Sequence, residues 1–148
     1  MSQVRIYLDN CCFNRPYDAQ DDDAIYLESE AKLFIQEKIK QGELELLWSY
    51  MISYENAENP DVDAREKIEG WSKLAKSDII ESGALIQRSL ALVAMGIKPK
   101  DAVHLACAIE GKAAIFFTTD KGILKKRDRI KEVEILNPVE YILWKERL

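Results

Sequence analysis

The fold is decided by residues 98–120, KPKDAVHLACAIEGKAAIFFTTD. Pro99 suits the first turn of a helix, the mostly apolar run 102–109 continues that helix, and Gly111 ends it. Residues 113–117 form a continuous apolar run with β-branched and aromatic members. That pattern predicts a strand that is covered on both of its faces. The segment therefore contains a helix that runs away, a glycine turn and a strand that runs back.

An acid stands at each outer end of this segment. Asp101 lies at the start of the predicted helix, and Asp120 closes the predicted strand. About ten helical residues cover roughly 15 Å, and five or six strand residues cover a similar distance. We therefore expect the two carboxylates to finish near each other and to share one site.

The whole chain has the composition of one globular domain over residues 1–148. It is 47% hydrophobic, which is enough for a proper core, and 32% charged. No apolar run reaches the roughly 18 residues of a membrane span, and the N-terminus enters a strand pattern at once. We expect a cytoplasmic protein with no membrane partner. The net charge of −5 argues against a broad basic surface for nucleic acid, although carboxylates that bind a metal would themselves make a nuclease acidic.

The three cysteines, Cys11, Cys12 and Cys107, are odd in number, and two of them are adjacent. This arrangement favours reduced, buried thiols over a disulfide framework. Neither the cysteine spacing nor the single histidine, His104, fits a usual zinc site. His104 lies within an apolar helix pattern, so we interpret it as a packed residue that is hydrogen-bonded to a neighbour.

Short apolar strands alternate with helices along the rest of the chain. Strands are expected over 4–8, 43–51, 77–81 and 132–136, and helices over 24–41, from 52, from 59, over 82–96 and from 137. Residues 11–23 are expected to be a loop, and 121–129 a basic segment. The apolar face of the helix over 24–41, expected to pack on the sheet, consists of Leu27, Ala31, Phe34, Ile35 and Ile39. This alternation predicts an α/β fold with a parallel sheet covered on both faces.

Four acids are expected at one edge of that sheet. Asp9 and Asp120 follow strands, Glu55 follows the strand over 43–51, and Asp101 begins a helix above them. Ligands of such sheets bind beyond the carboxyl ends of the strands. Glu58 lies one helical turn after Glu55 and is an alternative to it, although Glu55 is closer to the strand end.

Carboxylates packed together repel one another unless a cation lies among them. Ligation by oxygen atoms alone selects hard ions, Mg²⁺ or Mn²⁺, which bind a few carboxylates together with substrate phosphates. Such an ion activates water for attack on a phosphodiester. The four acids therefore predict a metal-dependent phosphodiesterase without a covalent nucleophile.

These residues resemble the PIN-domain metal-dependent nucleases over nearly the whole chain. The likeness rests on Asp9 after the first strand, on Glu55 in ISYEN, on Asp101 in KPKDAVHLACA and on Thr118-Thr119-Asp120 at a strand end. The resemblance implies a three-layer α/β/α sandwich in which these four acids bind Mg²⁺ or Mn²⁺. It also implies an endoribonuclease acting on single-stranded RNA, often a homodimer and often the toxin that a small antitoxin protein neutralises.

One departure from the family pattern concerns the residues after the first acid. Asn10 follows Asp9 directly, and Cys11 takes the place where the family usually has Asn. The hydrogen bonds that support the acids, expected here from Asn10 and Thr118, therefore differ from the usual ones. We expect an effect on metal affinity and rate without the loss of a ligand. Basic side chains that are candidates for contact with the RNA backbone are Arg15, Lys98, Lys100 and Lys121.

Two other functions compete with the nuclease. The first is a catalytically weak domain that acts as a protein–protein interaction module. The second is a phosphoryl-handling α/β enzyme. A dehalogenase-like phosphatase needs a second acid two places after the first, and Cys11 stands there. That version is disfavoured.

Overall fold

The computed structural model describes residues 3–146, which form a five-stranded sheet between helices. The strands are β1 (Val4–Leu8), β2 (Leu44–Ser49), β3 (Ser77–Ile79), β4 (Ile115–Phe117) and β5 (Glu134–Leu136). Their order across the sheet is β3-β2-β1-β4-β5, and each neighbouring pair is parallel. The parallel sheet expected from the alternating pattern is confirmed.

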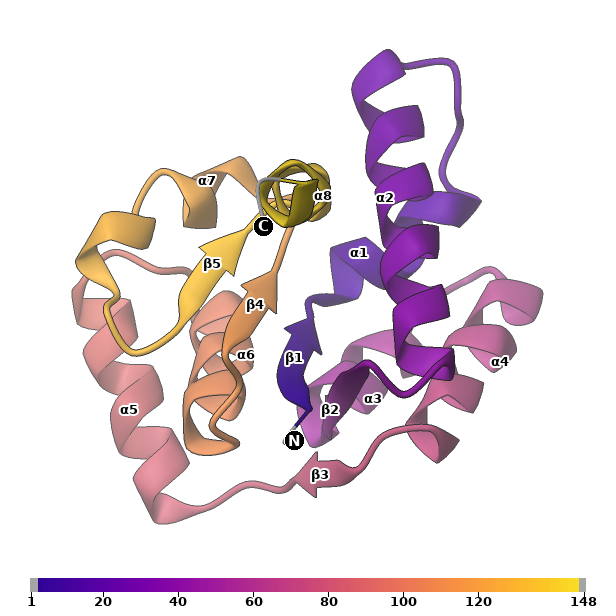
Figure 1. Ribbon diagram of the computed structural model, residues 1–148. Coiled ribbons are helices and arrows are strands. Elements are labelled where there is room, and N and C mark those ends of the chain that lie inside the picture. The colour runs from indigo at the N-terminus through magenta and orange to yellow at the C-terminus, as the bar shows by residue number, and fades with distance from the viewer. Residues whose placement is uncertain (1–2, 147–148) are drawn as a thin grey trace.

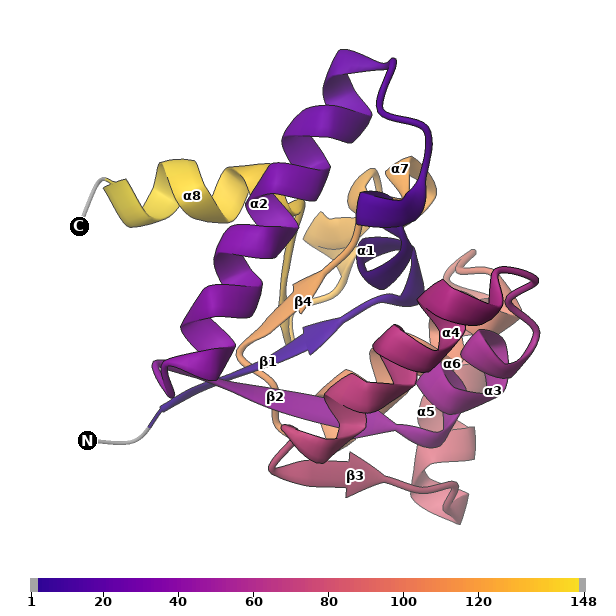
Figure 2. The ribbon, with the colours of Figure 1, turned by 90° about the vertical axis from the view of Figure 1, so that its right-hand side faces the viewer.

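Helices cover both faces of the sheet. They are α1 (Asn10–Asn14), α2 (Asp23–Lys40), α3 (Tyr50–Ala57), α4 (Val62–Gly70), α5 (Gly83–Ala94), α6 (Pro99–Glu110), α7 (Lys121–Leu124) and α8 (Pro138–Glu146), with 3₁₀ turns η1 (Arg15–Tyr17), η2 (Trp71–Lys73) and η3 (Arg127–Arg129). The helices α2 and α8 lie on one side of the sheet, and α5 and α6 lie on the other (Figures 1 and 2). This is the three-layer α/β/α arrangement. Within residues 3–146, no helix combines the length and the apolar character needed to cross a membrane.

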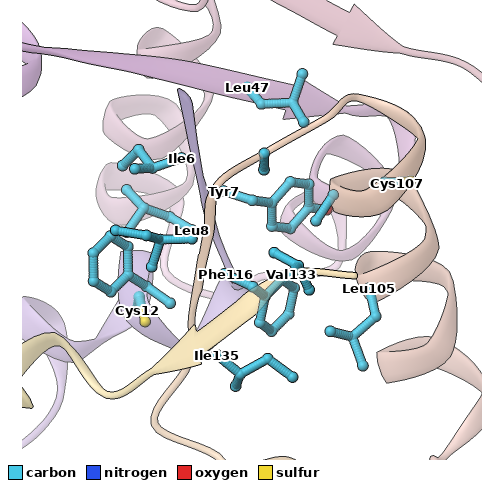
Figure 3. Packing of buried hydrophobic residues seen from close by; sticks show 14 of the residues in the cluster. Ile6, Tyr7, Leu8, Cys12, Leu47, Leu105, Cys107, Phe116, Val133 and Ile135 are labelled. Atoms are coloured by element: carbon cyan, nitrogen blue, oxygen red, sulfur yellow. The ribbon is translucent and has the colours of Figure 1, made fainter. Parts of the chain in front are cut away.

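Alternation along β1 divides the core between the two faces. Ile6 and Leu8 point to one side, and Tyr7 points to the other, toward Cys107 of α6 (Figure 3). All four side chains are buried. The Tyr7 ring stacks on Phe116 of the neighbouring strand, with 5.4 Å between the ring centroids. Tyr7 therefore joins β1 and β4 to the helix layer that carries Asp101.

The order of the strands places a crevice at the end of β1. The chain leaves β1 for β2 on one side and later returns as β4 on the other. In parallel sheets, a crevice that can bind a ligand forms at such a reversal of strand order, beyond the carboxyl ends of the strands. The backbone N–H of Asp9 donates to the carbonyl oxygen of Phe117 over 2.9 Å. The first acid is thus tied to the end of β4.

Several boundaries differ from those predicted. The strand expected over 43–51 ends at Ser49, because the Ser49 hydroxyl accepts a hydrogen bond from the backbone N–H of Ile52 and begins α3. The strand expected from residue 113 begins at Ile115. The expected loop over 11–23 contains most of α1 and all of η1, and the expected basic segment over 121–129 contains α7 and η3.

The buried face of α2 was wrongly predicted in part. Ala31, Ile35 and Ile39 are buried as expected, but Leu27 is 55% exposed and Phe34 is 37% exposed. The N-terminal half of α2, which contains Leu27, projects past the sheet (Figure 1). Nearer the sheet, the buried face of this helix includes a lysine, Lys32, which is 3% exposed.

Glycines end three helices in two different ways. Gly42 and Gly96 take positive φ angles of 81° and 96°, a conformation that costs glycine little. Gly111 instead has a φ of −79°, and Lys112 after it takes the positive φ of 61°. Gly111 is therefore required for space rather than for its backbone conformation.

We expect Gly111→Ala to destabilise the fold by about 1–3 kcal/mol, because a methyl group there collides with the buried Leu47 side chain and lies 3.1 Å from the Cys107 carbonyl oxygen. Gly70→Ala is the matched control, since nothing lies within 4 Å of a Cβ at that position. Urea unfolding measures both variants. Equal stability of the two variants would contradict the steric account.

Candidate metal centre

The four acids that the sequence singled out lie at the carboxyl-terminal edge of the sheet. Asp9 follows β1, and Asp120 follows β4 after two threonines. Glu55 is in α3, which begins directly after β2, and Asp101 is in the first turn of α6. Asp9 is 5% exposed, so its charge lies close to the core.

Asp9 is held by hydrogen bonds to both of its oxygens. Oδ1 accepts from the backbone N–H of Asn10 over 2.8 Å, and Oδ2 accepts from the Thr118 hydroxyl over 2.8 Å. The Cys11 thiol also donates to Oδ2 over 3.4 Å. The Thr118 hydroxyl oxygen accepts from the backbone N–H of Asp120 over 3.0 Å, which connects the first acid to the last. Asn10 thus contributes its backbone, and its own buried Oδ1 has no hydrogen-bond partner within residues 3–146.

Glu55 lies against the single histidine. Its Oε1 is 2.6 Å from Nε2 of His104, whereas Glu58 is exposed at the end of α3. Burial raises the pKa of Glu55, but the hydrogen bond and charge of His104, together with Lys100, outweigh burial and leave that pKa below its usual value. Burial lowers the pKa of His104, but Glu55 and Asp9 more than offset this and raise it. Of the two candidates, Glu55 is the one directed into the site.

Asp101 shows the strongest sign of crowded negative charge. Its pKa is raised to about 6, first by burial and then by the carboxylates of Asp9 and Asp120, against a smaller opposing effect of His104. Glu55 adds to the repulsion. The predicted proximity of Asp101 and Asp120 is therefore present, and the acids interact electrostatically.

Asp120 also begins a helix. Its Oδ1 accepts a hydrogen bond from the backbone N–H of Gly122 over 2.7 Å and caps α7. Asp101 and Asp120 line a small groove together with Lys98 and Lys126. Positively charged lysine side chains therefore lie at the rim of the acidic site.

The donor set fits a hard divalent cation. Within residues 3–146, no three His, Cys, Asp or Glu side chains stand in a geometry that would hold a metal ion as they are. A divalent cation would relieve the repulsion that raises the pKa of Asp101. The thiols do not favour zinc, because burial raises the pKa values of Cys12 and Cys107, that of Cys107 to about 12, and keeps both protonated.

The candidate phosphate contacts are placed differently from one another. Lys98, Lys100 and Lys121 are exposed. Lys100 and Lys121 are sequence neighbours of Asp101 and Asp120, and Lys98 lines the same groove as both acids. Arg15 forms ion pairs with Glu28 over 2.9 Å and with Asp18 over 3.0 Å. Its guanidinium therefore holds η1 against α2.

Two solved structures resemble this chain over most of its length. A chain of VapBC2 from Rickettsia felis, solved bound to a DNA fragment from its promoter, has a TM-score of 0.56 and 14% identity, with 90% of this chain and 98% of that one covered. A chain of VapBC-1 from nontypeable Haemophilus influenzae has a TM-score of 0.56 and 16% identity, with 91% and 98% covered. The chain has a PIN-like fold. No protein-family model and no curated protein sequence matches it.

The PIN-like fold brings residues to the site that sequence reasoning missed. Tyr7 was interpreted only as part of an apolar strand, yet its hydroxyl contacts His104 and Ser49. Cys11 was not missed: the sequence placed it where the family usually has Asn, and its thiol contacts Asp9 and Thr118. The signal for Tyr7 was its hydroxyl, since a buried tyrosine hydroxyl needs a hydrogen-bond partner.

We expect Asp101→Asn to raise the melting temperature of the metal-free protein by a few degrees at pH 7.5. The pKa of Asp101 rises from 3.8 to about 6 on folding. Asp101 holds its proton more tightly in the folded state, so the free energy of unfolding falls as pH rises through that window. Above pH 6 Asp101 is ionised in both states, and the full cost of its ionisation in the folded protein is present. After allowance for solvent screening, the cost is about 1 kcal/mol. Thermal unfolding in chelator at pH 7.5 and pH 3.5 measures it, and a gain that persisted at pH 3.5 would contradict this cause.

Proposed function

We propose that this protein is a divalent-metal-dependent endoribonuclease that hydrolyses phosphodiester bonds of single-stranded RNA. The observation that carries the proposal is the raised pKa of Asp101, caused by burial together with the carboxylates of Asp9 and Asp120. Acids that destabilise one another at the open edge of a sheet are costly unless they serve a cation. The PIN-like fold supports the same assignment.

In this proposal Asp9, Asp101 and Asp120 hold Mg²⁺ or Mn²⁺, with Glu55 directly or through water. The bound ion supplies the Lewis acidity that activates water and neutralises charge on the scissile phosphate. Thr118 keeps the carboxylate of Asp9 in one orientation.

The lysines at the rim have a separate role in the proposal. The exposed Lys98, Lys100 and Lys121 attract the RNA backbone to an otherwise acidic edge. Water, rather than a protein side chain, attacks the phosphorus, and the bond to the leaving oxygen breaks without a covalent enzyme intermediate.

We further propose that the chain acts in the cytoplasm as a toxin, that a small antitoxin protein neutralises it, and that it pairs with a second copy of itself. The fold shared with chains of VapBC assemblies supports an antitoxin partner. The three free cysteines support a reducing compartment.

The test of the nuclease is cleavage of single-stranded RNA by protein freed of metal and then given Mn²⁺ or Mg²⁺. We expect cleavage to require the added ion, to stop in excess chelator and to be slower on a duplex of the same sequence. Cleavage that continued in excess chelator would refute the proposal.

A second candidate is a protein-interaction module without catalysis. It is favoured by an apolar groove between α2 and α8, where Leu27 and Leu143 are exposed, and by the lack of a ready-made metal geometry in residues 3–146. Calorimetric titration separates the two functions. No heat of binding for Mn²⁺ at millimolar concentration would favour the module.

A further inference from the structure

A chain of buried polar groups leads from the end of β2 to the acidic edge. The Ser49 hydroxyl lies 2.7 Å from the Tyr7 hydroxyl, which lies 2.6 Å from Nδ1 of His104. On the other side of the ring, Nε2 of His104 lies 2.6 Å from Oε1 of Glu55. Ser49, Tyr7 and His104 are each fully buried. The chain of contacts therefore crosses β2, β1, α6 and α3 without meeting solvent before it reaches Glu55.

Donor and acceptor chemistry fixes the direction of the last hydrogen bond in this series, the one between His104 and Glu55. An ionised carboxylate only accepts hydrogen bonds, so Nε2 of His104 must carry the hydrogen that lies between it and Glu55. Nδ1 then faces the Tyr7 hydroxyl, which is fixed by the stacking of Tyr7 on Phe116. The Ser49 hydroxyl oxygen in turn accepts from the backbone N–H of Ile52. Each group has a partner, and the imidazole ring has one orientation.

We propose that His104 is a positioning residue, anchored by Tyr7, whose Nε2–H holds Oε1 of Glu55, so that the other carboxylate oxygen would remain available to a cation. This inference rests on the proposed metal-dependent function. Packing alone requires a ring of this size at position 104, but it does not require a donor at Nε2. Ligands of metal ions are commonly fixed by such outer hydrogen bonds, whose loss typically weakens metal binding 10–100-fold.

The single histidine of the chain allows a direct spectroscopic test. Protein prepared without a histidine tag and labelled with ¹⁵N-histidine gives ring signals from His104 alone. We expect Nε2 to be bonded to hydrogen in the metal-free protein. A spectrum with hydrogen on Nδ1 and a bare Nε2 would overturn the inference, whatever the protein cleaves.

Two substitutions separate the two sides of the ring. The amide nitrogen of Gln in His104→Gln reaches the place of Nε2 and keeps a donor for Glu55. The shorter Asn in His104→Asn reaches only the place of Nδ1, on the side of Tyr7. In calorimetric titration with Mn²⁺, we expect His104→Gln to bind within a few-fold of wild type and His104→Asn to bind at least about tenfold more weakly.

Tyr7→Phe tests the anchor, since it keeps the ring that stacks on Phe116 and removes only the hydroxyl. We expect Mn²⁺ binding to weaken by several-fold while the circular dichroism spectrum stays unchanged. Wild-type affinity in His104→Asn, or equal losses in His104→Asn and His104→Gln, would overturn the positioning role while leaving the metal site intact. No binding of Mn²⁺ by the wild type would instead refute the proposed function and the role of Glu55 together.

Discussion

Asp9→Asn is expected to slow the metal-dependent cleavage of RNA by about 100-fold or more. Asn has the shape of Asp, and its amide oxygen can accept the hydrogen bond from the backbone N–H of Asn10. Its amide nitrogen donates to the Thr118 hydroxyl oxygen, so the bond to Thr118 is kept with its direction reversed. The negative charge is what the substitution removes. Because Asp9 also raises the pKa of Asp101, the metal-free variant is expected to be at least as stable as the wild type. A loss of activity without a loss of stability identifies a functional acid.

Single-turnover cleavage of a labelled single-stranded RNA measures this effect. Asp63→Asn is the matched control, because Asp63 is an exposed acid in α4 whose side chain pairs with Lys67. The control is expected to cleave at the wild-type rate. An Asp9→Asn variant that kept more than a tenth of the wild-type rate would show that Asp9 is dispensable.

Lys32→Met is expected to stabilise the protein by roughly 2 kcal/mol at pH 7. Lys32 is 3% exposed, and burial lowers its pKa to about 8. Keeping such a group charged at pH 7 costs about 3 kcal/mol. The contacts of its amine with the rings of Phe13 and Trp71, at 5.3 Å and 5.2 Å, and its hydrogen bond to Oε1 of Gln36 over 2.6 Å together return about 1 kcal/mol. Met fills a similar volume without a charge.

The dependence on pH distinguishes this cause from better packing. Between pH 8 and the pKa of the unfolded chain, near 10.5, the unfolded state binds more protons at Lys32 than the folded state does. The free energy of unfolding of the wild type therefore increases relative to that of Lys32→Met as pH rises through that window, and the stability advantage of the variant becomes smaller. Urea unfolding at pH 7 and pH 10 measures this change, with the exposed Lys73→Met as the control. An advantage that stayed constant between the two values would contradict the role of charge.

The sequence predicted the central strands because their signals are local and strong. The apolar run that contains β4 and the alternating residues of β1 have few other ways to be buried. The short helices α1 and α7 were missed because acids of the proposed site begin them, Asp9 and Asp120 respectively. These acids were interpreted as metal ligands. Because the same two residues also cap the helices, the sequence contains no separate capping residue that would indicate a helix start.

The buried face of α2 was harder to predict, because burial there depends on where the helix ends relative to the sheet. Periodicity identified Ala31 and Ile35 correctly, but Leu27 lies beyond the covered part. Lys32 is buried through ring contacts with residues distant in sequence, Phe13 and Trp71. No local pattern predicts such contacts.

The candidate site was predicted as a set of residues, and the structure adds the connections among them. Convergence of the acids followed from the rule for parallel sheets, and the raised pKa of Asp101 is the physical sign of it. The interpretation of His104 as a buried, hydrogen-bonded residue is confirmed. Its partners, Tyr7 and Glu55, lie 97 and 49 residues away along the chain, so spacing alone gave no indication of them.

The central claim is that the acids at the edge of the sheet bind a divalent cation, and anomalous diffraction from a crystal soaked in Mn²⁺ tests it most directly. We expect a peak within about 2.3 Å of carboxylate oxygens of Asp9, Asp101 and Asp120, and no peak there in a crystal of Asp9→Asn treated in the same way. A Mn²⁺-soaked wild-type crystal with no peak at this edge, or with peaks only elsewhere on the protein, would contradict the account.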